Sequence, residues 1–399
     1  MSKQFKVLLI AVTVFAVLSD SMLLPFYPTF FSAVFNISDP AYVGTYIAAS
    51  CFVVMVCFPI WAFISKYINV LPLLVYSQIA AGVFSVSSFF ASDLNWFWFS
   101  SMAMFAFKAS YLLVYPYLMS LEAKKNHVAT IAMLSVVVHF GAILGALAGG
   151  FVLSALPGKA AFLIMALSDF TQVFVCAYLI RLAAPSKNQS PPVAKTSITS
   201  SSRWPVYQLG IVMLCFYFSA FLIRPFFAAY WQSISDTSSI VLASVVFSIP
   251  AFMALLALCF NHWRQHTNRN PINLLVVFML IITGVALQAS PLYLVVIAGR
   301  CLFGLSLFII IVRLDLLLYQ VSTPDKYAED FSKVSFCQSL GVLLASYCAG
   351  LLVKSSGLVI PFWVAAGGLA ISACCLWLLS KQSRRHTPCA NLASTTRAQ

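Results

Sequence analysis

Long apolar runs, rarely interrupted by a charged residue, recur along the whole chain of 399 residues and limit what it can fold into. A run of about 18 or more apolar residues has the length of a helix that crosses a lipid bilayer. Hydrophobic residues make up 62% of the chain and charged residues 8%, whereas soluble domains are about a quarter charged. We therefore predict an all-α membrane protein with no room for a sizeable soluble domain.

Marking these runs by their Pro, Gly and charged boundaries predicts twelve transmembrane helices. The separation of the ninth helix from the tenth depends on Ser290 and Pro291 alone. The predicted helices cover residues 7–34, 42–64, 71–91, 96–120, 129–155, 160–182, 206–231, 239–260, 271–289, 291–319, 331–353 and 359–380.

The distribution of basic residues predicts the orientation in the membrane. With the N-terminus in the cytoplasm, only Lys159 and Lys354 of the 23 Lys and Arg residues fall in external loops, and four more lie inside predicted helices. The other seventeen fall in cytoplasmic loops and tails or, like Arg181 and Lys333, at the cytoplasmic end of a predicted helix, which matches the known bias of Lys and Arg toward that side. We expect both termini in the cytoplasm and a place in a bacterial inner (plasma) membrane. This bias explains the formal net charge of +13, so we expect no nucleic-acid partner.

One extended polar stretch divides the apolar part of the chain into two halves. Residues 183–204 are rich in Ser, Pro, Thr and Lys, a composition typical of a flexible linker. We predict a six-helix half over residues 1–182, a cytoplasmic linker over 183–204, a second six-helix half over 205–380 and a cytoplasmic tail over 381–399. Two pseudo-symmetric halves around a site near the bilayer midplane are a recurrent transporter plan.

Charged residues inside the predicted helices indicate where a functional site lies, because such a residue is costly near the bilayer centre and usually faces a cavity or a partner. Asp20, Lys108, Arg224 and Arg300 lie in helices one, four, seven and ten. That period of three is typical of repeated three-helix units around a shared core. Further titratable residues lie inside helices five, six and ten; they are His139, Asp169, Arg313 and Asp315.

Tyrosines share a helical stripe with three of these charges. The stripes are Asp20 with Tyr27, Lys108 with Tyr111 and Tyr115, and Arg224 with Tyr217. We predict that these tyrosines and the basic residues Lys108, Arg224 and Arg300 line a cavity for an anionic or zwitterionic solute. Packing of Tyr hydroxyls against neighbouring helices is the alternative.

Asp20 is the first candidate for proton coupling, because burial and a nearby base shift the pKa of a carboxyl in opposite directions. Asp169 is the second candidate. A static bridge from Asp20 to Lys108 or to Arg224 is the alternative. His139 suits either helix packing or a proton relay. We expect Arg313 and Asp315 to pair with other helices at a cytoplasmic gate.

Small residues recur at every fourth position of the fifth predicted helix, which reads His139-Phe-Gly141-Ala-Ile-Leu-Gly145-Ala-Leu-Ala-Gly149-Gly150. Such a stripe lets another helix approach closely. It resembles the GxxxGPxxGG signature of proton-coupled antiporters in the major facilitator superfamily, with Ala146 in place of the proline. Arg300 and Gly304 resemble that superfamily's RxxxG element, and Pro25-Phe-Tyr-Pro28 resembles its drug and metabolite exporters. In helix four, Met104 replaces the Arg of that element and Lys108 the Gly.

The resemblance implies alternating access of two halves around a midplane site, coupled to protons, with export by antiport favoured over uptake by symport of a carboxylate metabolite or siderophore. A broad drug exporter and a transporter-like sensor are further alternatives. No GxxxxGK[ST] or HExxH motif occurs, so neither direct ATP drive nor a zincin-type enzyme is supported. We expect no cofactor and no metal, and a monomer in the lipid bilayer.

Overall fold

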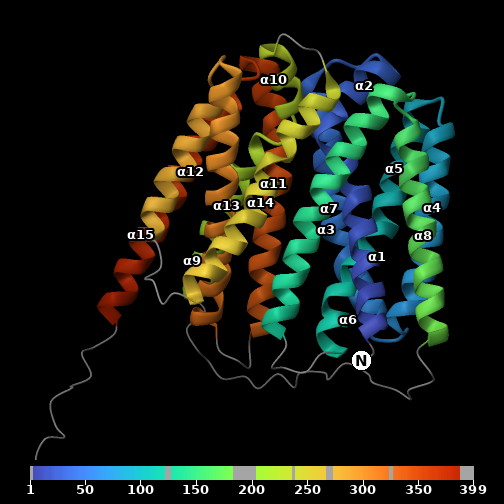
Figure 1. The fold of residues 1–399 in the computed structure, drawn as a ribbon, viewed down its shortest axis with the longest axis horizontal. Helices are drawn as coiled ribbons and strands as arrows, with labels where there is room; N and C mark the ends of the chain where they lie inside the picture. The colour runs from blue at the N-terminus through green and yellow to red at the C-terminus, as the bar shows by residue number, and fades with distance from the viewer. Residues whose placement is uncertain are drawn as a thin grey trace, which may run out of the picture.

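The computed structural model is a bundle of long helices that run roughly side by side between two ends (Figure 1). The structure describes residues 3–121, 127–182, 204–235, 239–266, 273–322 and 327–386. We name the end at which α1 begins the lower end, and the opposite end the upper end, as they appear in Figure 1. The predicted linker except Trp204, and residues 387–399 of the predicted tail, lie outside the described residues.

The described helices form twelve spans, which confirms the predicted fold class. Eleven are long and apolar enough to cross a membrane, and α12 is apolar but shorter, with 15 residues. Their elements are α1 (Lys3–Met22), η1 (Leu24–Phe26), α2 (Tyr27–Phe35), α3 (Pro40–Ile64), α4 (Val70–Phe90), α5 (Leu94–Lys108), η2 (Ala109–Leu113), α6 (Val114–Leu121), α7 (His127–Ala155), α8 (Ala160–Leu182), α9 (Trp204–Leu222), α10 (Phe227–Ile234), α11 (Ile240–His266), α12 (Leu274–Gln288), α13 (Tyr293–Val321), α14 (Tyr327–Ser356) and α15 (Ile360–His386).

The helix boundaries confirm one prediction and correct two. α12 and α13 are separate helices, so the predicted break at Ser290 and Pro291 is confirmed. α12 is shorter than the predicted residues 271–289. The last helix extends past the predicted residue 380 to His386, because the basic end of the span continues the helical hydrogen bonding instead of starting a tail.

Spans one, four and seven, which were predicted as continuous helices, are each broken. α1 is followed by η1, α5 by η2, and α9 by a turn over residues 223–226. Pro25 and Pro225 lie in two of these breaks and Pro116 follows the third. A proline has no N–H to donate to the carbonyl four residues earlier, and its ring clashes with that carbonyl. Each break therefore has a covalent cause in the sequence.

The first and seventh spans break in the same way at positions 200 residues apart, which shows the pseudo-symmetry of the two halves. Leu24-Pro25-Phe26 and Arg224-Pro225-Phe226 occupy equivalent places. Phe26 has φ −114° and ψ 6°, and Phe226 has φ −112° and ψ 6°. A short helix, α2 or α10, follows in each half.

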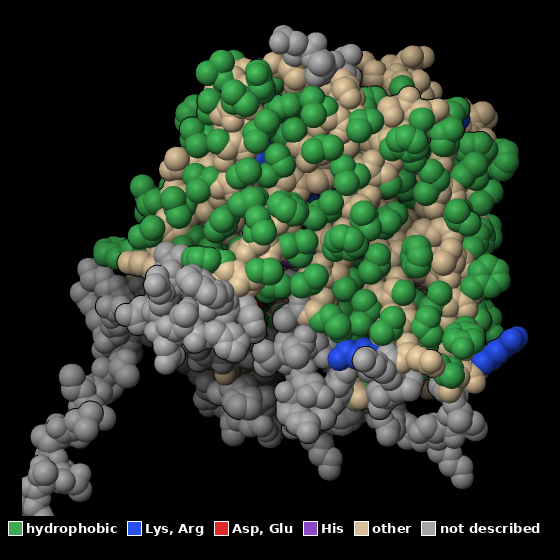
Figure 2. Space-filling model, viewed as in Figure 1, with side chains coloured by type: hydrophobic (Ala, Val, Ile, Leu, Met, Phe, Trp, Pro, Cys, Tyr) green, Lys and Arg blue, Asp and Glu red, His purple; other side chains and the backbone are tan. Residues whose placement is uncertain are grey.

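Apolar side chains cover the flank of the bundle, as a lipid-facing surface requires. Tyr76, Leu167 and Phe174 are 72%, 66% and 74% exposed. Figure 2 shows hydrophobic side chains over most of the face in view, while the most prominent Lys and Arg side chains lie at its lower edge. This surface suits a belt of lipid around the bundle.

The two halves are in close contact at the upper end. A Cβ on Gly44 of α3 would lie 2.8 Å from the Cα of Gly350 on α14. A Cβ on Gly150 of α7 would lie 2.5 Å from the Cβ of Ser244 on α11. Two helix pairs that join the halves, α3 with α14 and α7 with α11, therefore bring backbone against backbone or a small side chain at this end.

Candidate functional site

The breaks of spans one, four and seven carry three of the deep charges. Asp20 lies in the last turn of α1, Lys108 is the last residue of α5, and Arg224 lies in the turn after α9. The C-terminal end of a helix carries a partial negative charge. This partial charge attracts the basic side chains of Lys108 and Arg224, which lie at the ends of α5 and α9.

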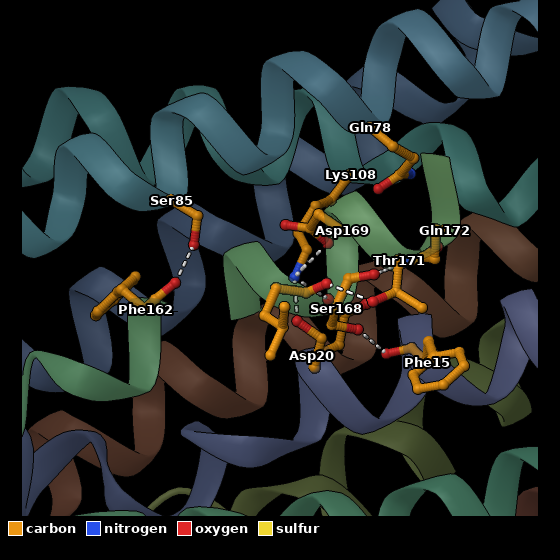
Figure 3. Close-up of polar contacts among 12 residues, drawn as sticks. Phe15, Asp20, Gln78, Ser85, Lys108, Phe162, Ser168, Asp169, Thr171 and Gln172 are labelled. Carbon is orange, nitrogen blue, oxygen red and sulfur yellow. Dashed lines mark hydrogen bonds and ion pairs between the residues drawn. The ribbon is translucent and has the colours of Figure 1, made fainter. Parts of the chain in front are cut away.

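Lys108 is held between two carboxylates (Figure 3). Its Nζ lies 3.4 Å from Oδ1 of Asp20 and 3.5 Å from Oδ1 of Asp169 on α8. It also donates a hydrogen bond of 2.6 Å to the hydroxyl of Ser19. The Lys108 and Asp169 side chains are 4% and 0% exposed, whereas that of Asp20 is 32% exposed. We call Asp20, Lys108 and Asp169 the triad.

The triad is not electrically balanced when both acids are ionised. Two carboxylates and one ammonium sum to one net negative charge, which is costly at a buried site. Neither Oδ1 nor Oδ2 of Asp169 has a hydrogen-bond partner among the described residues. A single proton on either acid would neutralise the group.

Buried amides extend this polar region, and the sequence analysis did not single them out. Gln78 of α4 donates to Ser110 over 3.4 Å, and Ser110 is also 2.6 Å from Ser77. Gln172 lies one turn beyond Asp169 on α8. The side-chain carbonyl oxygens of Gln78 and Gln172 have no hydrogen-bond partner in the part of the chain that the structure describes. Amides inside apolar runs were the signal that could have identified them.

The guanidinium of Arg224 has aromatic neighbours and no acidic partner among the described residues. Its central carbon lies 4.9 Å from the ring centre of Phe221 and 6.0 Å from that of Phe247 on α11. The thiol of Cys51 on α3 is within electrostatic range. Across the described ranges, no carboxylate or hydrogen-bond acceptor is recorded for this guanidinium. Arg224 thus remains able to bind an anionic group.

Arg300 was predicted to line the cavity, but its side chain is buried against the backbone of α11. It is 3% exposed, and its Nε donates to the carbonyl of Val246 over 3.3 Å. Its Nη2 donates to the carbonyl of Phe247. The guanidinium lies 3.9 Å from the ring centre of Phe227. The donors of Arg300 thus serve the backbone of α11.

The predicted tyrosines have different neighbours. Tyr111 and Tyr115 lie within electrostatic range of Asp20. Tyr217 stacks on Phe221, with ring centres 5.7 Å apart and planes at 13°. Tyr27 is 4% exposed and belongs to the aromatic core.

The glycine stripe of α7 packs on α1, except at its end. A Cβ on Gly141 would meet Val17, on Gly145 the carbonyl of Leu18, and on Gly149 the carbonyl of Met22. Gly150 instead faces α11 of the other half.

Of the three remaining predicted residues, His139 lies at the interface of the halves. His139 of α7 meets the ring of Phe308 on α13 edge to face at 5.6 Å. Asp315 is within electrostatic range of Tyr217. No ion pair is recorded for Arg313 or Asp315 among the described residues. Within the same ranges, no group of three or more His, Cys, Asp or Glu residues could hold a metal.

Comparison with protein families establishes the family of the chain. The model of the Major Facilitator Superfamily matches residues 9–312. The chain belongs to the major facilitator superfamily. It is therefore a multi-pass membrane protein and a secondary transporter of a small molecule, and not an enzyme. A comparison with curated protein sequences found no match.

Solved structures of the same fold align over nearly the whole chain at low sequence identity. The nucleoside transporter NupG has a TM-score of 0.73 at 13% identity and covers 94% of this chain and 99% of its own. A bacterial homologue of the human lysosomal transporter Spinster, inward-facing and occupied, has a TM-score of 0.76 at 13% identity, with coverages of 97% and 100%. The human organic anion transporter MFSD10 has a TM-score of 0.70 at 14% identity, with coverages of 93% and 98%. These likenesses establish the fold alone.

Proposed function

We propose that this transporter moves a small organic anion and couples its movement to protons. Arg224 carries the anion part of the proposal, because its half-buried guanidinium has two aromatic neighbours and no acidic partner among the described residues. A guanidinium binds a carboxylate through two parallel hydrogen bonds. A carboxylate on the solute would supply the counter-charge that Arg224 lacks.

The triad supports proton coupling. One bound proton removes its net negative charge, and Asp20 is the acid that is 32% exposed and can exchange that proton. Asp169, which is fully buried, is the second acceptor. In this proposal the ammonium of Lys108 is the counter-charge of the two acids and does not itself bind the solute.

The charges of the triad and of the solute also favour one mode of coupling, symport, over antiport. A proton on the triad removes a negative charge from the region of the bound anion, so each ligand strengthens the binding of the other. Two unit charges about 10 Å apart interact by about 1.7 kcal/mol at an effective dielectric constant of about 20. Mutual strengthening favours symport of proton and anion.

Export by antiport is the second candidate, which the glycine stripe of α7 and the region from Asp20 to Pro28 favour. Antiport requires the proton and the solute to compete. A zwitterionic solute, or a cationic drug, with an ammonium group at Asp20 would compete in this way. The charge bias of the loops supports cytoplasmic termini and a bacterial inner membrane, and we expect the protein to act as a monomer.

A matched panel of ligands tests the anion proposal. Benzoate, benzamide and benzylammonium share a ring and differ in charge, and citrate adds a second type of anion. We expect the anions to raise the unfolding temperature of the purified wild type more than the other two. The variant Arg224→Gln should lose about 2 kcal/mol or more of anion binding, the scale for truncating one partner of a buried charge pair. Strongest stabilisation by benzylammonium would contradict the proposal and support a cation exporter.

A further inference from the structure

Pro250 leaves two backbone carbonyls of α11 in need of a donor. It lies inside this helix, and it has no N–H to donate to the carbonyl of Val246, four residues earlier. A proline also disturbs the carbonyl of the residue after that, here Phe247. A buried carbonyl without a partner destabilises the structure, so these two need a donor from elsewhere.

Arg300 of α13 supplies both donors. Its Nε reaches the carbonyl of Val246 at 3.3 Å, and its Nη2 reaches that of Phe247. Only a forked, planar side chain offers two donors from one position in this way. The neighbouring turn of α13 packs closely against the same proline, since a Cβ on Gly304 would lie 2.3 Å from the Cα of Pro250.

The other half of the molecule lacks both parts of this arrangement. α3 and α11 begin 200 residues apart, at Pro40 and Ile240, so Ser50 is the counterpart of Pro250. α5 is the counterpart of α13 and has no basic residue before Lys108. The half without a proline at the position of Pro250, whose α3 has Pro59 nine residues later, is therefore also without the arginine.

The ring of Phe247 connects this arrangement to the anion site. Its centre lies 5.4 Å from the guanidinium of Arg300 and 6.0 Å from that of Arg224. Arg300 holds the carbonyl of the same residue and so fixes where the ring stands. We infer that Arg300 is a positioning residue, which replaces the missing proline amide and thereby holds Phe247 beside Arg224. This role rests on the proposed function of Arg224, and it differs from direct binding of the solute by Arg300.

A double-mutant cycle tests the inference. Arg300→Met removes both donors at similar length, and Pro250→Ala restores an N–H for the carbonyl of Val246. Thermal unfolding without ligand is measured for the wild type, both single variants and the double variant. The loss caused by Arg300→Met should be smaller in the Pro250→Ala background than in the wild type. Additive effects would overturn the replacement of the proline amide, whatever the solute is.

Binding of benzoate and citrate tests the positioning role. We expect Arg300→Met to lower their affinity about tenfold, as misplacement of a binding group does. The double variant should recover most of this affinity, and Arg313→Met on the same helix should leave it unchanged. If Arg300→Met lowers the affinity equally with and without Pro250, Arg300 binds the solute directly and the inference fails. If the wild type binds neither anion, the proposed function fails instead.

Discussion

Lys354 donates a hydrogen bond of 2.8 Å from its Nζ to Oδ2 of Asp39, and this bond joins the two halves at the upper end. It lies beside the close contact of Gly44 and Gly350. The hydrogen bond from Lys354 also lowers the pKa of the Asp39 carboxyl, which is outside the membrane spans. A lowered pKa means that the ionised bridge is complete above the ordinary value of about 4 and is lost as the pH falls through the lowered value.

We predict that loss of this bridge loosens the upper end. Asp39→Asn keeps an acceptor for the N–H of Ala41 in the first turn of α3 and removes the charge. This variant and Lys354→Gln should speed hydrogen exchange at the upper ends of α3 and α14, and acid below about pH 4 should do the same to the wild type. Exchange rates are corrected for their intrinsic dependence on pH.

Lys159→Gln is the control, because Lys159 donates to the carbonyl of Ala91 within one half. Unchanged exchange in both bridge variants would show that the glycine contacts close this end without the bridge.

Lys108→Ala should destabilise the protein strongly. It leaves Asp20 and Asp169 without their counter-charge at a buried site, and removal of one partner from a buried ion pair costs about 3–5 kcal/mol. The measurement is unfolding in detergent, with the exposed Lys66 replaced by Ala as the control. Adding Asp169→Asn to Lys108→Ala should recover part of the loss. A cost no larger than that of Lys66→Ala would contradict the triad.

Gly304→Ala and Gly367→Ala are a matched pair inside helices. A Cβ at residue 304 would lie 2.3 Å from the backbone of Pro250, whereas one at residue 367 would meet nothing within 4 Å. We expect Gly304→Ala to destabilise by about 1–3 kcal/mol through overpacking. Gly367→Ala should be neutral or stabilising, because Ala has the higher helix propensity. Equal unfolding temperatures for the two variants would contradict the close approach of α13 to α11.

Much of this fold follows from the sequence because each step depends on local chemistry. Apolar length gives the spans, and the number and order of spans give the two halves. The breaks of spans one and seven were also readable in principle, since Pro25 and Pro225 lie inside apolar runs. Their common geometry, however, becomes visible only when Phe26 and Phe226 are compared in three dimensions.

The site was less predictable, because it depends on which helices are neighbours. Periodicity along span four gives the face on which Lys108 lies, but not that Asp169 of span six lies opposite. Arg300 was predicted to line the cavity, since nothing local to span ten reveals that Pro250 of span eight leaves carbonyls there without a donor. Distances between helices, and not residue types, determine whether a basic side chain has no recorded partner, as for Arg224, or already donates to a neighbouring helix, as for Arg300.

The number of protons that move when an anion binds tests the central claim most directly. Titration calorimetry of benzoate or citrate in buffers of different ionisation enthalpy gives this number. We predict uptake of a fraction of a proton, up to one, by the wild type near neutral pH, and a smaller uptake or none by Asp20→Asn. Anion binding without any proton uptake in the wild type, or equal uptake in Asp20→Asn, would contradict the account.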